Sequence, residues 1–312
     1  MIDLLLLGTG AMVPLPNRWL SCLLVRAGGS LILFDCGEGT QVVWRRFGWG
    51  FKRLAAICLT HQHADHVAGL PGLLHTVSNA GRTEPLDIFG PTGTAAVIAG
   101  LRVIAPVLPF DVRVHELEPG ASFALPDGLR GNVVAGAHSI PVLAYRVERP
   151  RAPAFDPAAA RALGVPTSAW SALQHGEPVA FEGRQVRPED VLGLPRQGVA
   201  FAFVTDTRPV PAHLDVANGV DLLICEGTYG PSAKIETAIR NGHMTFAEAA
   251  TIARDADAGE LWLTHFGTGM PRPDEFIGEA TAVFPRTRIG RTGLAASLTF
   301  AHGLEELDPV GG

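Results

Sequence analysis

Residues 55–66 constrain the fold and the chemistry of this chain more than any other stretch. The unbroken apolar run Ala55–Leu59 is short, which predicts a buried β-strand. Within six residues it is followed by His61, His63, Asp65 and His66. Imidazole and carboxylate groups are ligands that Zn²⁺ prefers, and a buried strand would hold them on a rigid backbone. The stretch therefore predicts a metal site at the end of a strand.

Three further candidate ligand residues follow other strand-like runs far along the chain. The runs and the residues after them are Asn132–Ala137 with His138, Val199–Thr205 with Asp206, and Glu260–Thr264 with His265. In α/β proteins, ligands gather beyond the carboxyl ends of the strands. We therefore expect these three residues to join the cluster at 61–66 in one pocket.

The length and the alternating pattern favour a large α/β fold. With 312 residues and 47% hydrophobic content, the chain can bury a large core as one domain or as two fused halves. Strand-like and helix-like runs alternate, with a capping box at Thr245 and Glu248 and a helix start at Pro71. Thr92 is the expected N-cap of a helix ending at Leu101. We expect two sheets inside and helices outside.

Residues 149–197 differ from the rest of the chain. They are rich in Pro, Gly, Arg and Glu, and only Pro157–Leu163 predicts a helix. The segment is too long for an ordinary loop, and loops of this length are usually functional or mobile. It carries six arginines and five acidic residues, so it is almost neutral. We interpret it as a flexible arm inserted in the domain, either a weak clamp for RNA or a dimer contact.

Net charge and cysteine usage limit the partners and the compartment. The net charge of −6 means that a polyanionic substrate would need local arginines or metal ions. Cys22, Cys36, Cys58 and Cys225 form no Cys-x-x-Cys pair, which favours buried free thiols in a reducing cytoplasm. The N-terminal apolar run is too short for a signal peptide, and no segment approaches the roughly 18 apolar residues of a membrane span.

The sequence resembles the metallo-β-lactamase superfamily, and within it the ribonuclease Z family of zinc endonucleases that trim tRNA 3′ ends. His61–His66 matches the His-x-His-x-Asp-His motif of the superfamily. The strings that resemble ribonuclease Z are Leu33–Gln41, Gly69–Leu74, Asp206–Arg208 and Leu263–His265. The resemblance implies a four-layer αβ/βα sandwich, forming a single domain over residues 1–312 with the arm 149–197 inserted in it. It also implies two zinc ions, with Mn²⁺ or Fe²⁺ as possible replacements at such ligands.

The resemblance implies a role for each candidate site residue. His61, His63 and His138 would bind one ion, Asp65, His66 and His265 the other, and Asp206 would bridge them. Asp35 resembles the carboxylate that orients a ligand histidine. Asp65 would also accept a proton from the attacking water, His243 would give a proton to the leaving oxygen, and Glu226 would orient His243. The other histidines, His75, His115, His175, His213 and His302, are expected to have packing or surface roles.

Elements that would place the substrate differ from the family pattern. Pro14–Trp19 lacks the Lys and Asn of the Pro-x-Lys-x-Arg-Asn element and keeps Arg18 as a candidate substrate contact, and Gly164–Ala169 lacks a Gly-Pro pair. Three hypotheses stay open. The first is endonucleolytic removal of pre-tRNA 3′ trailers by metal-activated hydroxide, carried out by a homodimer. The second is hydrolysis of a small-molecule phosphodiester, sulfate ester or lactone. The third, a metal-binding module without turnover, is disfavoured by Asp65, Asp206 and His243.

Overall fold

The computed structural model describes residues 1–307, which divide into two compact units. The first unit comprises residues 1–149 together with the chain from residue 199 onward, and the second is Pro150–Gly198. Each unit has its own hydrophobic core, and all candidate site residues lie in the first.

The first unit contains two sheets. The strand order in one is β17-β16-β1-β2-β3-β4-β5-β6, and in the other β15-β14-β13-β12-β9-β8-β7. The first sheet comprises β1 Ile2–Gly8, β2 Cys22–Ala27, β3 Ser30–Phe34, β4 Leu54–Cys58, β5 Leu86–Gly90, β6 Val112–Glu116, β16 Ala295–Thr299 and β17 Gly303–Leu307. The second comprises β7 Ser122–Leu125, β8 Leu129–Ala135, β9 Leu143–Arg151, β12 Arg196–Val204, β13 Leu222–Glu226, β14 Glu260–Thr264 and β15 Thr287–Ile289. In the first sheet β3, β4, β5 and β6 are parallel, each to the next. In the second sheet β12, β13, β14 and β15 are parallel in the same way.

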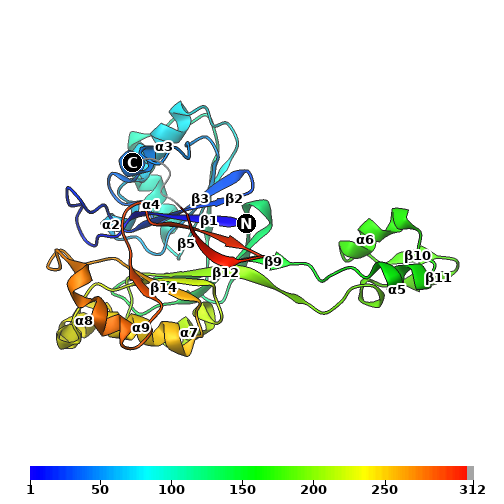
Figure 1. Cartoon of the computed structure of the whole chain (residues 1–312). Coiled ribbons are helices and arrows are strands. Elements are labelled where there is room, and N and C mark those ends of the chain that lie inside the picture. The colour runs from blue at the N-terminus through cyan, green and yellow to red at the C-terminus, as the bar shows by residue number, and fades with distance from the viewer. Residues whose placement is uncertain (308–312) are drawn as a thin grey trace. The chain divides into compact units, whose positions relative to one another are not determined.

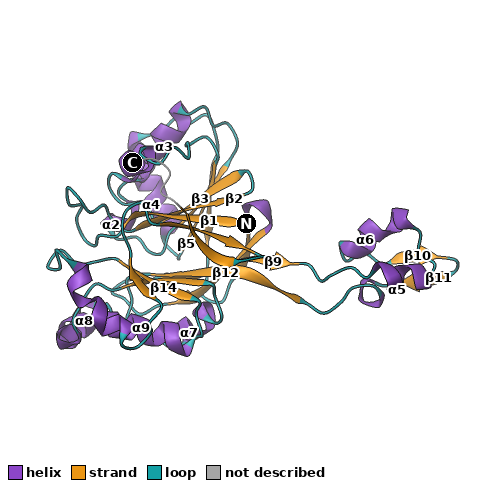
Figure 2. Cartoon of the chain, in the orientation of Figure 1, coloured by secondary structure: helices purple, strands orange, loops and turns teal. Residues whose placement is uncertain are grey.

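Helices cover the outer faces of the two sheets, so the predicted four-layer αβ/βα sandwich is confirmed (Figures 1 and 2). The helices of this unit are α1 Thr40–Arg45, α2 Ala64–Val67, α3 Leu70–Asn79, α4 Thr94–Leu101, α7 Ala212–Ala217, α8 Ile235–Asn241, α9 Phe246–Asp255 and α10 Ile277–Thr281. Figure 1 shows α3 and α4 on one side and α7, α8 and α9 on the other. The short 3₁₀ turns are Arg102–Ile104, Pro126–Gly128, Ser232–Lys234 and Pro273–Phe276.

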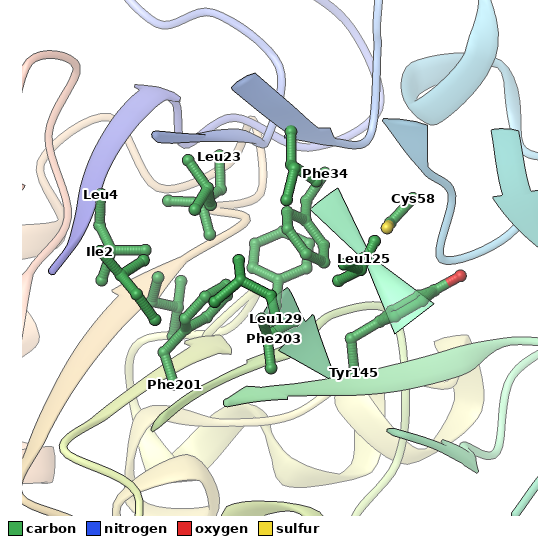
Figure 3. Packing of buried hydrophobic residues seen from close by; sticks show 14 of the residues in the cluster. Ile2, Leu4, Leu23, Phe34, Cys58, Leu125, Leu129, Tyr145, Phe201 and Phe203 are labelled. Carbon is green, nitrogen blue, oxygen red and sulfur yellow. The ribbon is translucent and has the colours of Figure 1, made fainter. Parts of the chain in front are cut away.

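The main core lies between the sheets, where side chains from both point toward each other (Figure 3). Phe34 of β3 makes edge contacts with Tyr145 of β9 and Phe201 of β12, each at 5.6 Å between ring centroids. The Tyr145 hydroxyl donates a hydrogen bond to the backbone oxygen of Leu59 at 2.7 Å, and Leu143 N donates to Thr60 O at 2.9 Å. These two bonds join the sheets immediately before the histidine cluster.

Most predicted elements are present, and the differences have local causes. The capping box at Thr245 and Glu248 is confirmed. Thr92 is not the N-cap of α4, because its hydroxyl donates to Glu118 and Gly93 occupies the cap. Several elements of this unit were not predicted, namely β7, β15, β16, β17, α2, α7, α8 and α10.

The second unit has more regular structure than its composition suggested. It contains α5 Pro157–Ala162, α6 Trp170–Gln174, a hairpin of β10 Val179–Phe181 and β11 Arg184–Val186, and 3₁₀ turns at Thr167–Ala169 and Pro188–Asp190. Its core consists of Ala160, Val165, Leu173, Val186 and Val191. These apolar residues are too widely spaced to produce a periodic pattern. The flexibility of the segment stays a prediction.

The four cysteines, Cys22, Cys36, Cys58 and Cys225, are buried free thiols, as the sequence predicts. Among the described helices, none has the length and apolar character that crossing a bilayer requires.

Buried His213 in α7 makes stability depend on pH. Burial lowers its pKa from 6.5 to about 4, and its Nε2 has no hydrogen-bond partner among the described residues. Below pH 6.5 the unfolded chain binds a proton that the native state refuses, so stability falls as pH falls. We expect this histidine alone to lower the free energy of unfolding by about 2 kcal/mol between pH 7 and pH 5. Urea unfolding at both pH values should show that His213→Gln loses less of its free energy of unfolding between pH 7 and pH 5 than the native chain does. The exposed variant His302→Gln is the control, and equal losses in all three proteins would contradict the assignment.

Candidate metal centre

The predicted ligands meet at one edge of the sandwich because each lies just beyond the carboxyl end of a strand. The His61–His66 turn follows β4, His138 follows β8, Asp206 follows β12 and His265 follows β14. β4 belongs to one sheet and the other three strands to its partner sheet. The site is therefore built by both sheets.

The first ligand group is His61, His63, His138 and Asp206, whose ligand atoms all lie within 4.8 Å of one another. His63 Nδ1 is 3.0 Å from His61 Nε2 and 3.3 Å from His138 Nε2. Asp206 Oδ2 lies 3.6 Å from His61 Nε2 and 4.0 Å from His138 Nε2. Three ring nitrogens and one carboxylate oxygen therefore converge on one point.

The second group is Asp65, His66, Asp206 and His265, with the same limit of 4.8 Å between ligand atoms. Asp206 Oδ1 is 3.3 Å from His66 Nε2 and 2.9 Å from His265 Nε2. Asp65 Oδ2 is 3.5 Å and 3.6 Å from the same two nitrogens. Asp206 thus presents one carboxylate oxygen to each group, which is the arrangement of a bridging ligand.

The electrostatics of the site favour a cation. Burial would raise the pKa of Asp206, but the charges of His265 and His66 hold it well below its usual range. Burial would lower the pKa of His265, but the Asp206 carboxylate raises it to about 10. The buried carboxylate of Asp206 is therefore ionised and attracts positive charge to the ring nitrogens around it.

Asp35 fixes the orientation of two histidines. It accepts a hydrogen bond from His66 Nδ1 at 2.8 Å, which leaves Nε2 of that ring free to bind a metal. The Thr60 hydroxyl donates to Asp35 at 2.9 Å, so its oxygen accepts from His61 Nδ1 at 3.1 Å. Such partners set the tautomer and the ring angle of a ligand histidine. One buried carboxylate therefore orients a ligand in each group.

Two other ligand rings are oriented by different partners. The Thr228 hydroxyl donates to Glu226 at 2.7 Å and accepts from His265 Nδ1 at 3.0 Å. His138 Nδ1 donates to the backbone oxygen of Gly242 at 3.1 Å. In both rings Nε2 is the nitrogen that faces the ligand group.

The residues present fit bound metal ions. Nε2 of His66 and Nε2 of His265 are buried and have no hydrogen-bond partner within residues 1–307, although each points at carboxylate oxygens. Buried polar atoms are almost always satisfied, so two such nitrogens side by side indicate ligands. The donor set consists of nitrogen and oxygen only, which suits Zn²⁺, Mn²⁺ or Fe²⁺.

The backbone is constrained where it supplies these groups. Asp35, Asp206 and His265 have φ values of 58°, 52° and 56°, a region that non-glycine residues rarely occupy. Met12, whose N–H donates to Asp65 Oδ2 at 2.8 Å, has a φ of 69°. Such conformations persist where the surrounding structure determines them and cluster at functional sites.

His243 and Glu226 form a hydrogen-bonded pair beside both ligand groups, since the His243 ring also lies 5.5 Å from that of His265. His243 Nδ1 is 3.1 Å from Glu226 Oε1, and the His243 ring lies 5.0 Å from that of His138. Glu226 is buried at the end of β13 and also accepts from Thr207 N, Met244 N, Thr228 N and the Thr228 hydroxyl. These donors occupy both carboxylate oxygens, so Glu226 serves to orient His243 and its neighbours.

Arg208 connects three of the loops that carry site residues. Its guanidinium donates to the backbone oxygen of His243 at 2.6 Å and forms an ion pair with Glu248. Its own N–H donates to Ala137 O at 2.9 Å. Because Arg208 lies two residues after Asp206, it links the loops that carry Asp206, His138 and His243.

Arg18 has partners in the protein backbone. Its Nη1 donates to Met270 O at 2.9 Å and its Nη2 donates to Pro271 O at 2.7 Å. The guanidinium also lies over the Phe266 ring at 5.8 Å. Arg18 thus fixes the loop after β14, and a direct contact with substrate stays a prediction.

Sequence reasoning missed the residues that orient the ligands. These residues are Thr60, Thr228, Gly242 and Arg208, and they act through hydrogen bonds, which in three of them reach a residue distant in sequence. Thr60 carried a usable signal, because it directly precedes the first ligand. Gly242 could not be found, since it contributes only a backbone oxygen.

Gly242 offers a test of how closely the His138 ring is positioned. Its φ is 72°, and an added Cβ would lie 2.9 Å from His138 Nδ1. We expect Gly242→Ala to displace the ring and weaken metal binding by about 10- to 100-fold. The matched control is Gly219→Ala, because Gly219 has a φ of 59° and open space around its Cβ position. Competition titration with a chelating dye measures both affinities, and equal values would show that the contact with His138 has no effect.

Comparison with known proteins defines first the class and then the family. Residues 20–151 match the model of the metallo-beta-lactamase superfamily, and residues 156–266 match that of the beta-lactamase superfamily domain. The metallo-β-lactamase-fold protein YhfI from Bacillus subtilis superposes with a TM-score of 0.69 at 20% identity, covering 95% of this chain and 99% of that one. This neighbour shows the fold. The class is thus that of metal-dependent hydrolases with the metallo-β-lactamase fold.

Curated relatives narrow this class. Ribonuclease Z of Lachnoclostridium phytofermentans is 42% identical over 96% of this chain and 99% of its own length. Ribonuclease Z of Clostridium beijerinckii is 43% identical, with coverage of 96% and 99%. The short form of human tRNase Z superposes with a TM-score of 0.69 at 25% identity, covering 96% of this chain and all of that one. The chain belongs to the ribonuclease Z family of the metallo-β-lactamase superfamily, and it is a metal-dependent hydrolase of the endoribonuclease type.

Proposed function

We propose that this enzyme is a dinuclear zinc phosphodiesterase that removes the 3′ trailers of pre-tRNA. The observation that carries the proposal is the position of Asp206, which presents one oxygen to each of two ligand groups beside the His243–Glu226 pair. The curated relatives named ribonuclease Z and the human tRNase Z structure support RNA as the substrate.

The protein groups divide the proton transfers between them. Divalent ions held by such residues make water acidic and polarise phosphoryl oxygens. Asp65 Oδ2 lies at the edge of the second ligand group, where it can accept the proton of the attacking water. Glu226 accepts from His243 Nδ1 and so leaves Nε2 to carry a proton to the leaving oxygen. Thr207 and Met244 hold Glu226 for this purpose through their N–H groups.

The identity of the ions is part of the proposal. Five imidazoles and two carboxylates suit zinc, while Mn²⁺ and Fe²⁺ accept the same donors. Metal analysis of the purified protein by mass spectrometry should find about two equivalents. A single equivalent would contradict the dinuclear arrangement.

Hydrolysis of a small-molecule ester is the second candidate function. The observation that favours it is Arg18, whose guanidinium is already bonded to two backbone oxygens. Arg18 keeps its positive charge, but two of its N–H donors are already used, so the loop 14–19 offers a polyanion fewer free donors than its sequence suggested.

The deciding experiment compares a pre-tRNA transcript carrying a 3′ trailer with bis(p-nitrophenyl) phosphate. We expect both to be cut, the transcript at the end of the acceptor stem. Hydrolysis of the diester without any cut in the transcript would refute the tRNA proposal.

The variant His243→Ala tests whether His243 is the general acid that protonates the leaving oxygen. It should slow transcript cleavage by about 100-fold or more, and slow the nitrophenyl ester much less, because p-nitrophenolate leaves without protonation. Equal losses would refute the role of His243.

We also propose that the enzyme acts in the cytoplasm as a homodimer. The four buried free thiols support a reducing compartment. Sedimentation analysis of the purified protein measures the assembly, and a monomer at micromolar concentration would refute the dimer.

A further inference from the structure

We infer that a cavity adjoining the metal centre is a subsite for a nucleobase of the nucleotide next to the scissile phosphate. This inference rests on the proposed function, since it takes a nucleic acid as the substrate. The cavity has a volume of about 270 Å³, and all of its lining residues belong to the first unit. Its principal lining residues are Met12, Tyr229, Lys234, Thr237, Met270 and Phe276.

The cavity begins where the ligand groups end. Met12 N donates to Asp65 Oδ2 at 2.8 Å on one side. Thr228, another lining residue, orients His265 through its hydroxyl at 3.0 Å. The Tyr229 ring lies 6.4 Å from the ring of His243. A group attached to a phosphate held between Asp65 and His243 would therefore enter this cavity.

The lining suits a flat heterocycle with polar edges. Tyr229 and Phe276 provide aromatic faces, and Met12 and Met270 provide polarisable, adaptable surfaces. Thr237 and Lys234 are polar groups available for the edge of a base. A volume slightly below the roughly 300–1,000 Å³ of sites for drug-sized ligands fits a single base. Stacking on aromatic side chains is a sequence-tolerant way to hold a base, because every base has a π-face.

Contacts within the protein preform the walls of the cavity. Arg18 holds one wall through its bonds to Met270 O and Pro271 O. Gly230 allows Phe276 and Met270 to approach closely, since an added Cβ would lie 2.6 Å from the Phe276 ring and 2.7 Å from Met270 Sδ. Asn241 donates to the Tyr229 hydroxyl at 2.6 Å and so fixes the far end of that ring. These contacts limit the ordering cost when a base binds.

The test measures binding, so it does not require turnover. Equilibrium dialysis of the full-length, metal-loaded protein would compare uridine 3′- and 5′-monophosphate with ribose 5-phosphate, which lacks the base. We expect the affinity of the tighter-binding uridine nucleotide to exceed that of ribose 5-phosphate by a ratio of about ten or more. Thr237→Phe would fill the cavity and Phe276→Ala would remove an aromatic wall, and each should bring this ratio close to one. Thr83→Phe, at an exposed position outside the cavity, should keep the ratio of the native protein.

The outcomes separate this inference from the proposed function. A ratio near one in the native protein, or a ratio that neither cavity variant changes, would overturn the subsite even if pre-tRNA is cut. Tighter binding of p-nitrophenyl phosphate than of either nucleotide would also overturn it, since the cavity would then serve a small organic ester. A base-dependent ratio without pre-tRNA cleavage would leave the subsite standing and refute the tRNA substrate. The two cavity variants lie on different elements, so failure of one to fold leaves the other informative.

Discussion

Replacement of Asp206 by alanine is expected to eliminate both the second metal equivalent and most of the hydrolytic activity. Its two oxygens face different ligand groups, so the change removes one ligand from each. Loss of a partner that merely orients a metal ligand already costs about 10- to 100-fold, and loss of a shared ligand should exceed that. Metal analysis and the hydrolysis rate of bis(p-nitrophenyl) phosphate, measured on the same sample, provide the two readouts.

The control for this variant is Asp215→Ala, which removes an exposed carboxylate from α7. It should retain two equivalents of metal and the native rate. If Asp206→Ala also retained both, Asp206 would not be a bridging ligand, and the assignment of the two groups would have to be abandoned.

Replacement of Glu226 by glutamine should damage the protein far more than the similar shape of the two side chains suggests. Five contacts from hydrogen-bond donors converge on its two carboxylate oxygens. A glutamine amide has only one oxygen, so its NH₂ group must face some of these donors and leave them unsatisfied. We expect the free energy of unfolding to fall by about 2–4 kcal/mol, because both the donors and the side chain are buried. The turnover number should fall by about 100- to 10,000-fold, since His243 loses its orienting partner.

The stability of Glu226→Gln is best measured by urea unfolding, together with kcat for the pre-tRNA transcript. Glu305→Gln, on the exposed face of β17, makes the same chemical change without buried donors and should be neutral. A variant of Glu226 with the stability of the native chain would show that the donors find other acceptors, and the orienting role would then need another explanation.

The ligands were predictable because each lies next to a signal within its own segment. An apolar run such as Ala55–Leu59 predicts a strand, and the residue after the threonine that closes the run lies at the end where ligands gather. His61, Asp206 and His265 all follow this rule. The overall sandwich was predictable for a related reason, since the strand and helix patterns of the core are strong and regular.

The groups that orient the ligands were not predictable, because they depend on distances between segments. Gly242 acts through a backbone oxygen and a left-handed conformation, neither of which its residue type reveals. The bonds that hold Arg18 were hidden for the same reason, because its two carbonyl partners lie in a loop more than 250 residues away. The small core of the second unit was missed because Ala160 and Val191 are far apart in sequence.

The two hydrogen bonds that cross between the sheets at Tyr145 and Leu143 couple the metal centre to the completion of folding. The first half of the chain contributes His61–His66, but Asp206 and His265 arrive only when the second sheet closes over it. An ion that binds only the closed arrangement stabilises it by mass action, and any change that separates the sheets must weaken the affinity for metal by the same free energy. Metal affinity is therefore a measure of how tightly the two halves are joined, and substitutions in the buried interface near Phe34 should alter it without touching a ligand.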